Sequence, residues 1–367
     1  MKTRYLLIII LVVILVIAGF FIINALKYSD RDKPTGSASH QTVETEESPY
    51  VLLNNNIINL LPKDQIPPLE DPNYTTVDKA HFLDDTDKVF VLESVETTYI
   101  FPRKIMVWHE IVNETIDGNA VSITYCPLTG SVIGYEGNIA GYKNNTYGTS
   151  GKLLNSNLVL YDRETDSSIP QILGVAVNNA LEGNELATRP VYWADWSDAK
   201  AAYPDALVLS LETGYHRDYF TDPYGSYDPD SPGSYYTNGE PMYKVINEND
   251  GTFIDKKIVV GVKYEDHRLA LDPDLVSVKG IVEFDIGGEP SVAFYDSGLK
   301  AIRVFSSSLD SQKLKFTYDN ETITDNRGTQ WSANGTSENS ENLEPLTYFD
   351  VMWFAWYAYY PETNVIK

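Results

Sequence analysis

An unbroken apolar run near the start of the chain limits its architecture more than any other feature. It extends from Tyr5 to Leu26 without a charged residue. A helix of about 22 residues rises roughly 33 Å, enough for a hydrocarbon core of about 30 Å. A cleaved signal peptide is the alternative, but its apolar region is shorter and ends in small residues, whereas Ala18-Gly19 is followed here by Phe20-Phe21. The run therefore predicts an uncleaved transmembrane anchor.

The flanking charges predict the orientation of this anchor. A short basic tail with Lys2 and Arg4 is easier to keep inside the cell than a large domain, so the C-terminal part is expected outside. The residues after the run are polar and include Pro, Gly, Ser and Thr, as in a flexible stalk. No later break in composition divides the chain, which favours one domain. For this single-pass plasma-membrane protein we expect a cytoplasmic tail at 1–4, an anchor at 5–26, a stalk at 27–49 and an extracytoplasmic globular domain at 50–367.

Charge and composition exclude several classes of protein. The formal net charge is −24, and such a surface repels phosphate backbones, which argues against nucleic-acid binding. Hydrophobic residues make up 43% of the chain, enough to bury a core and to exclude a disordered protein. Cys126 is the only cysteine, so no intramolecular disulfide can form. Stability outside the cell must then come from packing, ions or glycans.

Five Asn-x-Ser/Thr motifs are compatible with N-glycosylation of an outward-facing domain. They lie at Asn73, Asn113, Asn144, Asn320 and Asn334. The motif is short and recurs by chance, so each one alone is a weak signal. The other partners expected for such a domain are a surface protein or a small ligand, and their identity is left open.

The local patterns predict a mainly β, α+β domain with few helices. Short runs rich in β-branched residues, bounded by turn residues, indicate strands at 88–95, 120–125, 131–135, 157–161, 206–210, 257–262, 280–284 and 301–305. Helical patterns are fewer, and are found at about 105–114, 193–203 and 346–358.

Two aromatic segments resemble each other within the chain. Trp193-x-x-Trp196 leads to Tyr203-Pro204, and Trp353-x-x-Trp356 leads to Tyr360-Pro361. Each predicts a short aromatic helix that ends before a proline. The spacing from tryptophan to proline differs by three residues, which favours a recurrent structural device over a duplicated domain. Packing of these aromatic faces on a sheet is the simpler interpretation, and a platform for a carbohydrate or aromatic ligand is the alternative.

Linked motifs are spread along the C-terminal part of the chain. They are Trp108-His109-Glu110, Tyr125-Cys126-Pro127-Leu128-Thr129-Gly130, Ser150-Gly151-Lys152, Tyr161-Asp162-Arg163-Glu164, Glu212-Thr213-Gly214, Asp222-Pro223-Tyr224 and Phe354-Ala355-Trp356. Together they resemble the domain-of-unknown-function family 3179, over about residues 90–367. The family is bacterial and archaeal, and the resemblance implies no activity. Many of its members have a second cysteine where this chain has Thr129, so a dithiol or two-sulfur metal site is not implied here.

Cys126, His109 and Glu110 form the first candidate site. A cysteine beside an imidazole can act as a thiolate nucleophile, and the same pair can bind copper or zinc. The two residues lie on neighbouring predicted elements, a short helix and the strand that follows it, so we expect them to share a pocket. The alternative is that Cys126 is a small buried side chain and that His109 packs against the sheet.

Two further sets of polar residues are candidates for binding. The first could hold a carboxylate or phosphate through its cations, or could instead fix a strand end by ion pairs. Its members are Lys152, Asn155, Asn157, Asp162, Arg163 and Arg217. The second set offers oxygen ligands to calcium on a loop rich in Gly and Pro, or is simply a solvated acidic loop. Its members are Asp222, Asp228 and Asp230.

The common signatures of serine hydrolases, zinc proteases and dinucleotide-binding enzymes are absent from the sequence. Two functions therefore remain. One is a cell-surface domain that binds a ligand or partner, and the other is an extracytoplasmic enzyme or metal carrier centred on Cys126 and His109. A single cysteine is thin support for catalysis, which favours the binding domain.

Overall fold

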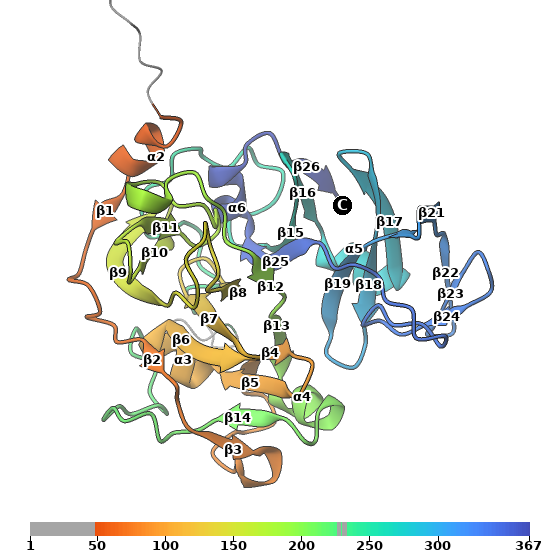
Figure 1. Ribbon diagram of the computed structural model, residues 1–367, viewed down its shortest axis with the longest axis horizontal. Helices are drawn as coiled ribbons and strands as arrows, with labels where there is room; N and C mark the ends of the chain where they lie inside the picture. The colour runs from red at the N-terminus through yellow and green to blue at the C-terminus, as the bar shows by residue number, and fades with distance from the viewer. Residues whose placement is uncertain (1–47, 226–228, 230–232) are drawn as a thin grey trace, which may run out of the picture. The chain divides into compact units, whose positions relative to one another are not determined.

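The computed structural model describes residues 48–225, 229 and 233–367, and residues 48–367 form one compact unit (Figure 1). Among the described residues no helix combines the length and apolar character needed to span a membrane. The predicted tail and anchor, and all but the last two residues of the predicted stalk, lie outside the described residues.

Short strands make up most of the described chain, and the expectation of a mainly β fold with few helices is confirmed. Each predicted strand is present. The N-terminal arm, residues 48–76, contains α2 (Val51–Asn55), β1 (Ile58–Asn59), β2 (Leu69–Glu70) and β3 (Tyr74–Thr76). It is followed by β4 (Lys88–Glu93), β5 (Thr98–Pro102), α3 (Arg103–His109), β6 (Ile111–Ile116), β7 (Asn119–Cys126), β8 (Ser131–Glu136), β9 (Tyr147–Leu154), β10 (Asn157–Asp162), β11 (Ser168–Pro170), β12 (Thr188–Arg189), β13 (Tyr192–Asp195), α4 (Trp196–Ala202) and β14 (Leu207–Leu209).

The remainder of the chain repeats much of this order. It contains β15 (Ile258–Tyr264), β16 (His267–Leu271), α5 (Pro273–Lys279), β17 (Ile281–Ile286), β18 (Glu289–Asp296), β19 (Ala301–Ser306), β20 (Ser308–Leu309), β21 (Gln312–Lys313), β22 (Phe316–Asp319), β23 (Thr322–Asp325), β24 (Gln330–Trp331), β25 (Thr347–Met352), α6 (Trp353–Tyr359) and β26 (Asn364–Ile366). We call β4 to β8 with β13, α4 and β14 the first repeat. The second repeat is β15 to β19 with β25, α6 and β26.

The two repeats share one sheet topology. In the first, four strands are ordered β13-β4-β5-β14, and in the second they are ordered β25-β15-β16-β26. In both sheets the last strand pairs in parallel and the others pair antiparallel. Each repeat also has an antiparallel meander, β6-β7-β8 or β17-β18-β19. The strands β9 to β12 are inserted in the first repeat and β20 to β24 in the second.

Equivalent residues of the two repeats are separated by the same number of positions in the sequence, from the first strand to the end of the meander. Lys88 starts β4 as Ile258 starts β15, Ile111 starts β6 as Ile281 starts β17, and Cys126 ends β7 as Asp296 ends β18. Main-chain hydrogen bonds are repeated too, since Trp196 N donates to Asp87 O over 2.8 Å and Trp353 N donates to Lys257 O over 2.8 Å. The chain therefore contains an internal duplication.

This duplication corrects the interpretation of the two tryptophan segments. Trp196 is equivalent to Trp353, because each starts a helix of seven residues that ends at a tyrosine with φ −131°. Aligning Trp193 with Trp353 produced the apparent difference in spacing. The tryptophans at 353 and 356 are fully buried, as expected for aromatic faces that pack on a sheet.

The predicted helices were all longer than the observed ones, because each predicted segment included part of a neighbouring strand. The helix expected at 105–114 ends at His109, because Glu110 has φ 59° and the β-branched residues after it form β6. The segments expected at 193–203 and 346–358 begin as the strands β13 and β25. Helix α5 was missed, although Asp272 caps it by accepting from Asp274 N and proline occupies its first turn.

The repeats pack against each other in a reciprocal way. Met352 N at the end of β25 donates to Thr129 O, over 2.8 Å, in the turn before β8. Arg303 on β19 is almost completely buried and binds Glu93 on β4, with Nη1 to Oε2 at 2.6 Å. The apolar clusters are shared between the repeats and lie within residues 48–367. This segment therefore has a complete core, and we expect it to fold without the preceding residues.

Candidate functional site

Glu110 has a left-handed backbone conformation at the end of α3. Its φ is 59°, its N–H donates to Met106 O over 2.7 Å, and its carbonyl accepts from Tyr125 N over 2.7 Å. The second repeat makes the same two bonds from Gly280, whose φ is 75°. A non-glycine residue in this left-handed region destabilises the folded state by about 1 kcal/mol or more, whereas glycine adopts it without that steric cost. The first repeat thus holds a carboxyl group at a conformational cost that the second repeat avoids.

The Glu110 side chain lines a cavity of about 490 Å³. The walls come from the N-terminal arm, from the end of β7 and its turn, from the hairpin of β9 and β10, and from residues 242–243. The lining is mostly apolar, with six polar side chains. The apolar residues are Leu60, Leu61, Ile66, Pro127, Leu128, Leu153, Leu158 and Met242, and the polar ones are Glu110, Cys126, Thr149, Lys152, Tyr224 and Tyr243.

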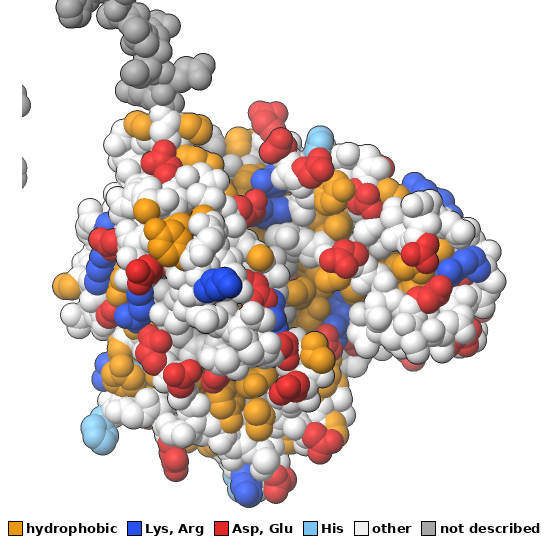
Figure 2. All heavy atoms as spheres, in the orientation of Figure 1, with side chains coloured by type: hydrophobic (Ala, Val, Ile, Leu, Met, Phe, Trp, Pro, Cys, Tyr) orange, Lys and Arg blue, Asp and Glu red, His pale blue; other side chains and the backbone are white. Residues whose placement is uncertain are grey.

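The N-terminal arm is held over this cavity by Gly151. Both Leu60 N and Leu61 N donate to Gly151 O over 3.0 Å. Gly151 has φ 71°, and a Cβ at this position would overlap the carbonyl group of Leu61. Only glycine allows the arm to approach β9 so closely. Apolar side chains gather on the surface over α2 in Figure 2, where Leu52 is 61% exposed.

Burial controls the protonation of Glu110. Removal from water raises the pKa of its carboxyl group to about 8, and a hydrogen bond with Tyr224 acts in the opposite direction. Desolvation disfavours a carboxylate because the charged form loses more hydration than the neutral acid. At neutral pH Glu110 is therefore an uncharged carboxylic acid, which can donate a hydrogen bond into the cavity.

Cys126 lines the same cavity and is only 2% exposed. Leu158 N donates to its sulfur over 3.4 Å, and the thiol contacts Ser156 O at 3.9 Å. Burial, followed by the nearby Glu110 carboxyl group, raises the pKa of the thiol to about 11. The group is thus a protonated thiol at neutral pH, without the lowered pKa of an activated nucleophile.

His109 is fully buried, and both ring nitrogens have partners other than Cys126. Nδ1 lies 2.7 Å from Pro67 O, and Nε2 lies 2.7 Å from the hydroxyl of Tyr219. Burial lowers the pKa of the imidazole to about 4. A carbonyl oxygen only accepts, so Nδ1 donates to it and Nε2 accepts from Tyr219. The structure brings Cys126 to Glu110 and directs His109 elsewhere.

Three of the predicted binding residues are engaged inside the fold. Asn157 donates to Gln171 Oε1 over 2.8 Å and accepts from Ile172 N over 2.9 Å. Asn155 accepts from Ile246 N over 2.8 Å at the tip of the hairpin. Asp162 is fully buried and accepts from Thr165 N over 2.7 Å. These side chains fix turns and strand ends.

The three predicted cations have different surroundings. Arg163 pairs with Glu70 at 2.8 Å and with Asp64 at 3.5 Å, as in the alternative in which ion pairs fix a strand end. Arg217 is exposed, and its guanidinium lies 5.7 Å from the centre of the Trp108 ring. Lys152 is half-buried in the cavity wall, and its ammonium group has no ion-pair partner within the described residues.

The expected calcium loop is only partly described. Asp228 and Asp230 lie outside the described residues, and Asp222 Oδ2 lies 3.5 Å from Nη2 of Arg103. No group of three or more His, Cys, Asp or Glu side chains that could hold a metal ion occurs in the described chain.

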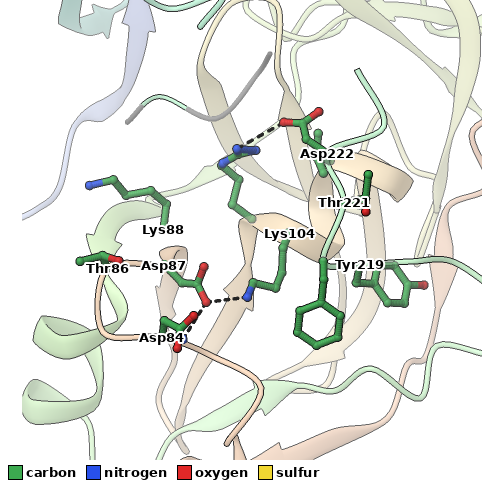
Figure 3. Close-up of a pocket in the computed structure, with 11 residues that line it drawn as sticks. Asp84, Thr86, Asp87, Lys88, Lys104, Tyr219, Thr221 and Asp222 are labelled. Atoms are coloured by element: carbon green, nitrogen blue, oxygen red, sulfur yellow. Dashed lines mark hydrogen bonds and ion pairs between the residues drawn. The ribbon is translucent and has the colours of Figure 1, made fainter. Parts of the chain in front are cut away.

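Asp222 also lines a second cavity, of about 580 Å³ and largely polar, shown in Figure 3. Several of its charges are paired with each other, since Lys104 contacts Asp87 at 2.6 Å and Asp222 contacts Arg103. Lys88 is paired with Asp195 at 2.6 Å. These ion pairs engage most of the charged side chains of this cavity, so it offers fewer free charges to a ligand.

The glycosylation motifs have different exposures. Asn113 is 2% exposed and donates to Tyr147 O over 2.9 Å, so its amide nitrogen is occupied in the folded protein. Asn73, Asn144, Asn320 and Asn334 are exposed. Figure 2 shows Asp and Glu side chains spread over the face in view, with Lys and Arg in small groups among them.

Sequence reasoning missed the apolar part of the site. Leu60, Leu61 and Met242 were not singled out, and they are 45%, 44% and 52% exposed at the cavity. The available signal was the Leu60-Leu61-Pro62 group next to a polar stalk. Two large apolar residues in such a place indicate a segment that packs on the domain.

Known proteins were compared with the chain in three ways. Neither the curated proteins nor the solved structures gave a match. The scan of protein families matched residues 63–363, which covers both repeats except β26 and every side chain of the cavity except Leu60 and Leu61. On that match, and in agreement with the resemblance noted from its motifs, the chain belongs to the family described as "Protein of unknown function (DUF3179)".

Proposed function

We propose that this protein is a membrane-anchored, extracytoplasmic domain that binds a small ligand in the cavity lined by Glu110 and Cys126. The observation that supports this most is the position of Glu110. A carboxyl group is buried in an apolar wall, in a left-handed backbone conformation that the equivalent Gly280 accommodates without a side chain. Strained backbone and buried acids concentrate at functional sites, because a fold gains nothing from them by itself.

The shape and chemistry of the cavity also support binding. Its volume of about 490 Å³ lies within the range of about 300–1,000 Å³ that is typical of small-molecule sites. Such sites combine a mostly apolar lining with a few polar groups that fix the orientation of the ligand. Here those groups are the Glu110 acid, the Cys126 thiol and the Lys152 ammonium group.

Catalysis by a thiolate, or metal binding through Cys126 and His109, has less support. The thiol has a raised pKa, the adjacent Glu110 is protonated at neutral pH, and His109 uses both nitrogens elsewhere. Without rearrangement, neither Glu110 nor His109 can then accept the proton of the Cys126 thiol.

The membrane part of the proposal rests on the apolar run from Tyr5 to Leu26. Protease treatment of intact cells should degrade the domain while the anchor is protected. Full protection of an epitope at the C-terminus would contradict the outward orientation.

Ligand binding is tested with the segment 48–367 and 1-octanol, an uncharged apolar probe, by titration calorimetry. Leu153→Trp should fill the cavity and reduce the affinity at least ten-fold. Val278→Trp is the matched control, because Val278 is 86% exposed on α5, and it should leave binding unchanged. The absence of saturable binding, or equal loss in both variants, would overturn the proposed site.

A further inference from the structure

Among the described residues that line the cavity, one carries a positive charge, and the single carboxyl group is protonated at neutral pH. Lys152 is the only Lys or Arg among the described residues that line it, and Glu110 is its only carboxyl group. Burial keeps Glu110 in its neutral form at that pH. In a chain with a net charge of −24, this makes the cavity a local exception to the acidic surface.

The backbone of Lys152 is fixed on both sides. It pairs with Asn59 of β1 and with Val159 of β10, and its N–H donates to Ser150 Oγ over 3.1 Å. The side chain therefore starts from a rigid point in the wall. An ammonium group that has no carboxylate partner in such a place is available to an anionic ligand.

The composition of the wall restricts the kind of anion. A phosphate group carries up to two charges and is usually held by several cations or by the fork of an arginine. One lysine among eight apolar side chains matches a single charge on a hydrocarbon body better. A carboxylate is the simplest group of that kind.

We propose, building on the binding function above, that the cavity takes a monocarboxylic acid with a hydrocarbon body. The carboxylate pairs with Lys152, and the hydrocarbon body lies against the leucines of the arm and of the β9–β10 hairpin. Glu110, as a neutral acid, adds no repulsion to the bound anion. The exposed apolar side chains Leu60, Leu61 and Met242 lie where the body of the ligand enters.

The test compares octanoate, 1-octanol and octylamine on the segment 48–367 at pH 6.5, where octanoate is ionised. Octanoate should bind about ten-fold more tightly than octanol, and octylamine should bind more weakly than both. Extending the acid from six to eight to ten carbons should tighten binding about four-fold per methylene, since each buried methylene contributes about 0.8 kcal/mol.

Lys152→Gln should abolish the preference for octanoate over octanol, and its urea-denaturation midpoint should match that of the unmodified segment, which shows that the variant is folded. Lys279→Gln removes an exposed lysine at the end of α5 and should change neither. Equal binding of octanoate and octanol by the unmodified segment would overturn the monocarboxylate assignment and leave the binding function standing. Binding of none of the three probes would overturn both.

Discussion

The two repeats share their strand order, helices and several backbone hydrogen bonds, yet they differ at one junction, the residue between the first helix and the strand that follows it. At the end of the first helix of each repeat, the first has Glu110 facing a cavity and the second has Gly280. A Cβ at Gly280 would overlap the ring of Tyr318, which comes from β22 of the insertion. The junction is thus open in one copy and filled in the other. The two repeats are equivalent scaffolds, and the insertion of the second repeat fills the junction that borders a cavity in the first.

A second pair of equivalent residues shows the same division. Cys126 is a neutral thiol in the cavity, whereas Asp296 is an ion-paired carboxylate that contacts Arg303 Nε at 2.9 Å. Arg303 also binds Glu93 of the first repeat. The polar groups at this level of the second repeat therefore hold the repeats together, and those of the first line the apolar cavity.

The largest effect is expected from Arg303→Ala, which tests the structural role of the second repeat. Removing this buried cation leaves the carboxylates of Glu93 and Asp296 without their partner, which costs about 3–5 kcal/mol. Urea denaturation of the segment 48–367 measures the loss. Ile133 is the equivalent residue of the first repeat and makes no such pair, so Ile133→Val should cost only about 1 kcal/mol. Similar losses of unfolding free energy in both variants would show that the two repeats do not differ in this structural role.

A smaller loss is expected when the junction of the first repeat is copied into the second. Gly280→Glu places a side chain at φ 75° against Tyr318, so strain and overpacking should cost about 3 kcal/mol. The free energy of unfolding at pH 6 provides the measurement. A cost below 1 kcal/mol would mean that the second junction is not filled as described.

The pH dependence of stability should show an effect of about 2 kcal/mol. Glu110 has a pKa of about 8 in the folded protein against an ordinary value of 4.5, so its contribution is complete below pH 4.5 and is lost as the pH rises to 8. His109, with a pKa of about 4 against 6.5, acts in the opposite direction between pH 4 and 6.5. From pH 6.5 to 8 the Glu110 contribution is the largest and should lower the unfolding free energy by about 2 kcal/mol, while Lys256, whose pKa burial lowers to about 8, opposes it by less.

Glu110→Gln isolates this term, because the amide cannot ionise. Its unfolding free energy should change little between pH 6.5 and 8, while the unmodified segment loses stability. Parallel curves for the two proteins would show that the carboxyl group is not buried in the folded state.

The smallest effect is expected from Glu110→Gly, which gives the first repeat the residue of the second. Relief of the left-handed strain should raise the free energy of unfolding by about 1 kcal/mol at pH 8.5, where the buried carboxylate is also charged. Octanoate binding should change at the same time, since the wall loses a side chain. A loss of more than 1 kcal/mol would mean that Glu110 stabilises the fold.

The sequence predicted the strands well because β-branched runs such as those at 257–262 and 301–305 are local signals. It also named Glu110, Cys126 and Lys152. It placed Cys126 with Glu110, but it added His109 to them and put Lys152 in a separate set, because the cavity is assembled by the N-terminal arm and a hairpin that lie far apart in the chain. Nothing in Trp108-His109-Glu110 marks a left-handed residue. The duplication was hidden because the repeats keep their topology and their hydrophobic pattern but few identical side chains.

The reciprocal packing of the repeats has a consequence for how the chain reaches its native state. The sheet β13-β4-β5-β14-β3 joins strands far apart in the chain, and the apolar residues of β8 are covered by β25, so many native contacts join residues far apart in sequence. High contact order slows folding, because long loops must close before their contacts stabilise them. During synthesis, a chain that has not yet reached residue 352 leaves the apolar face of β8 uncovered. Until the last two strands have emerged, this exposed apolar surface makes the incomplete chain prone to aggregation.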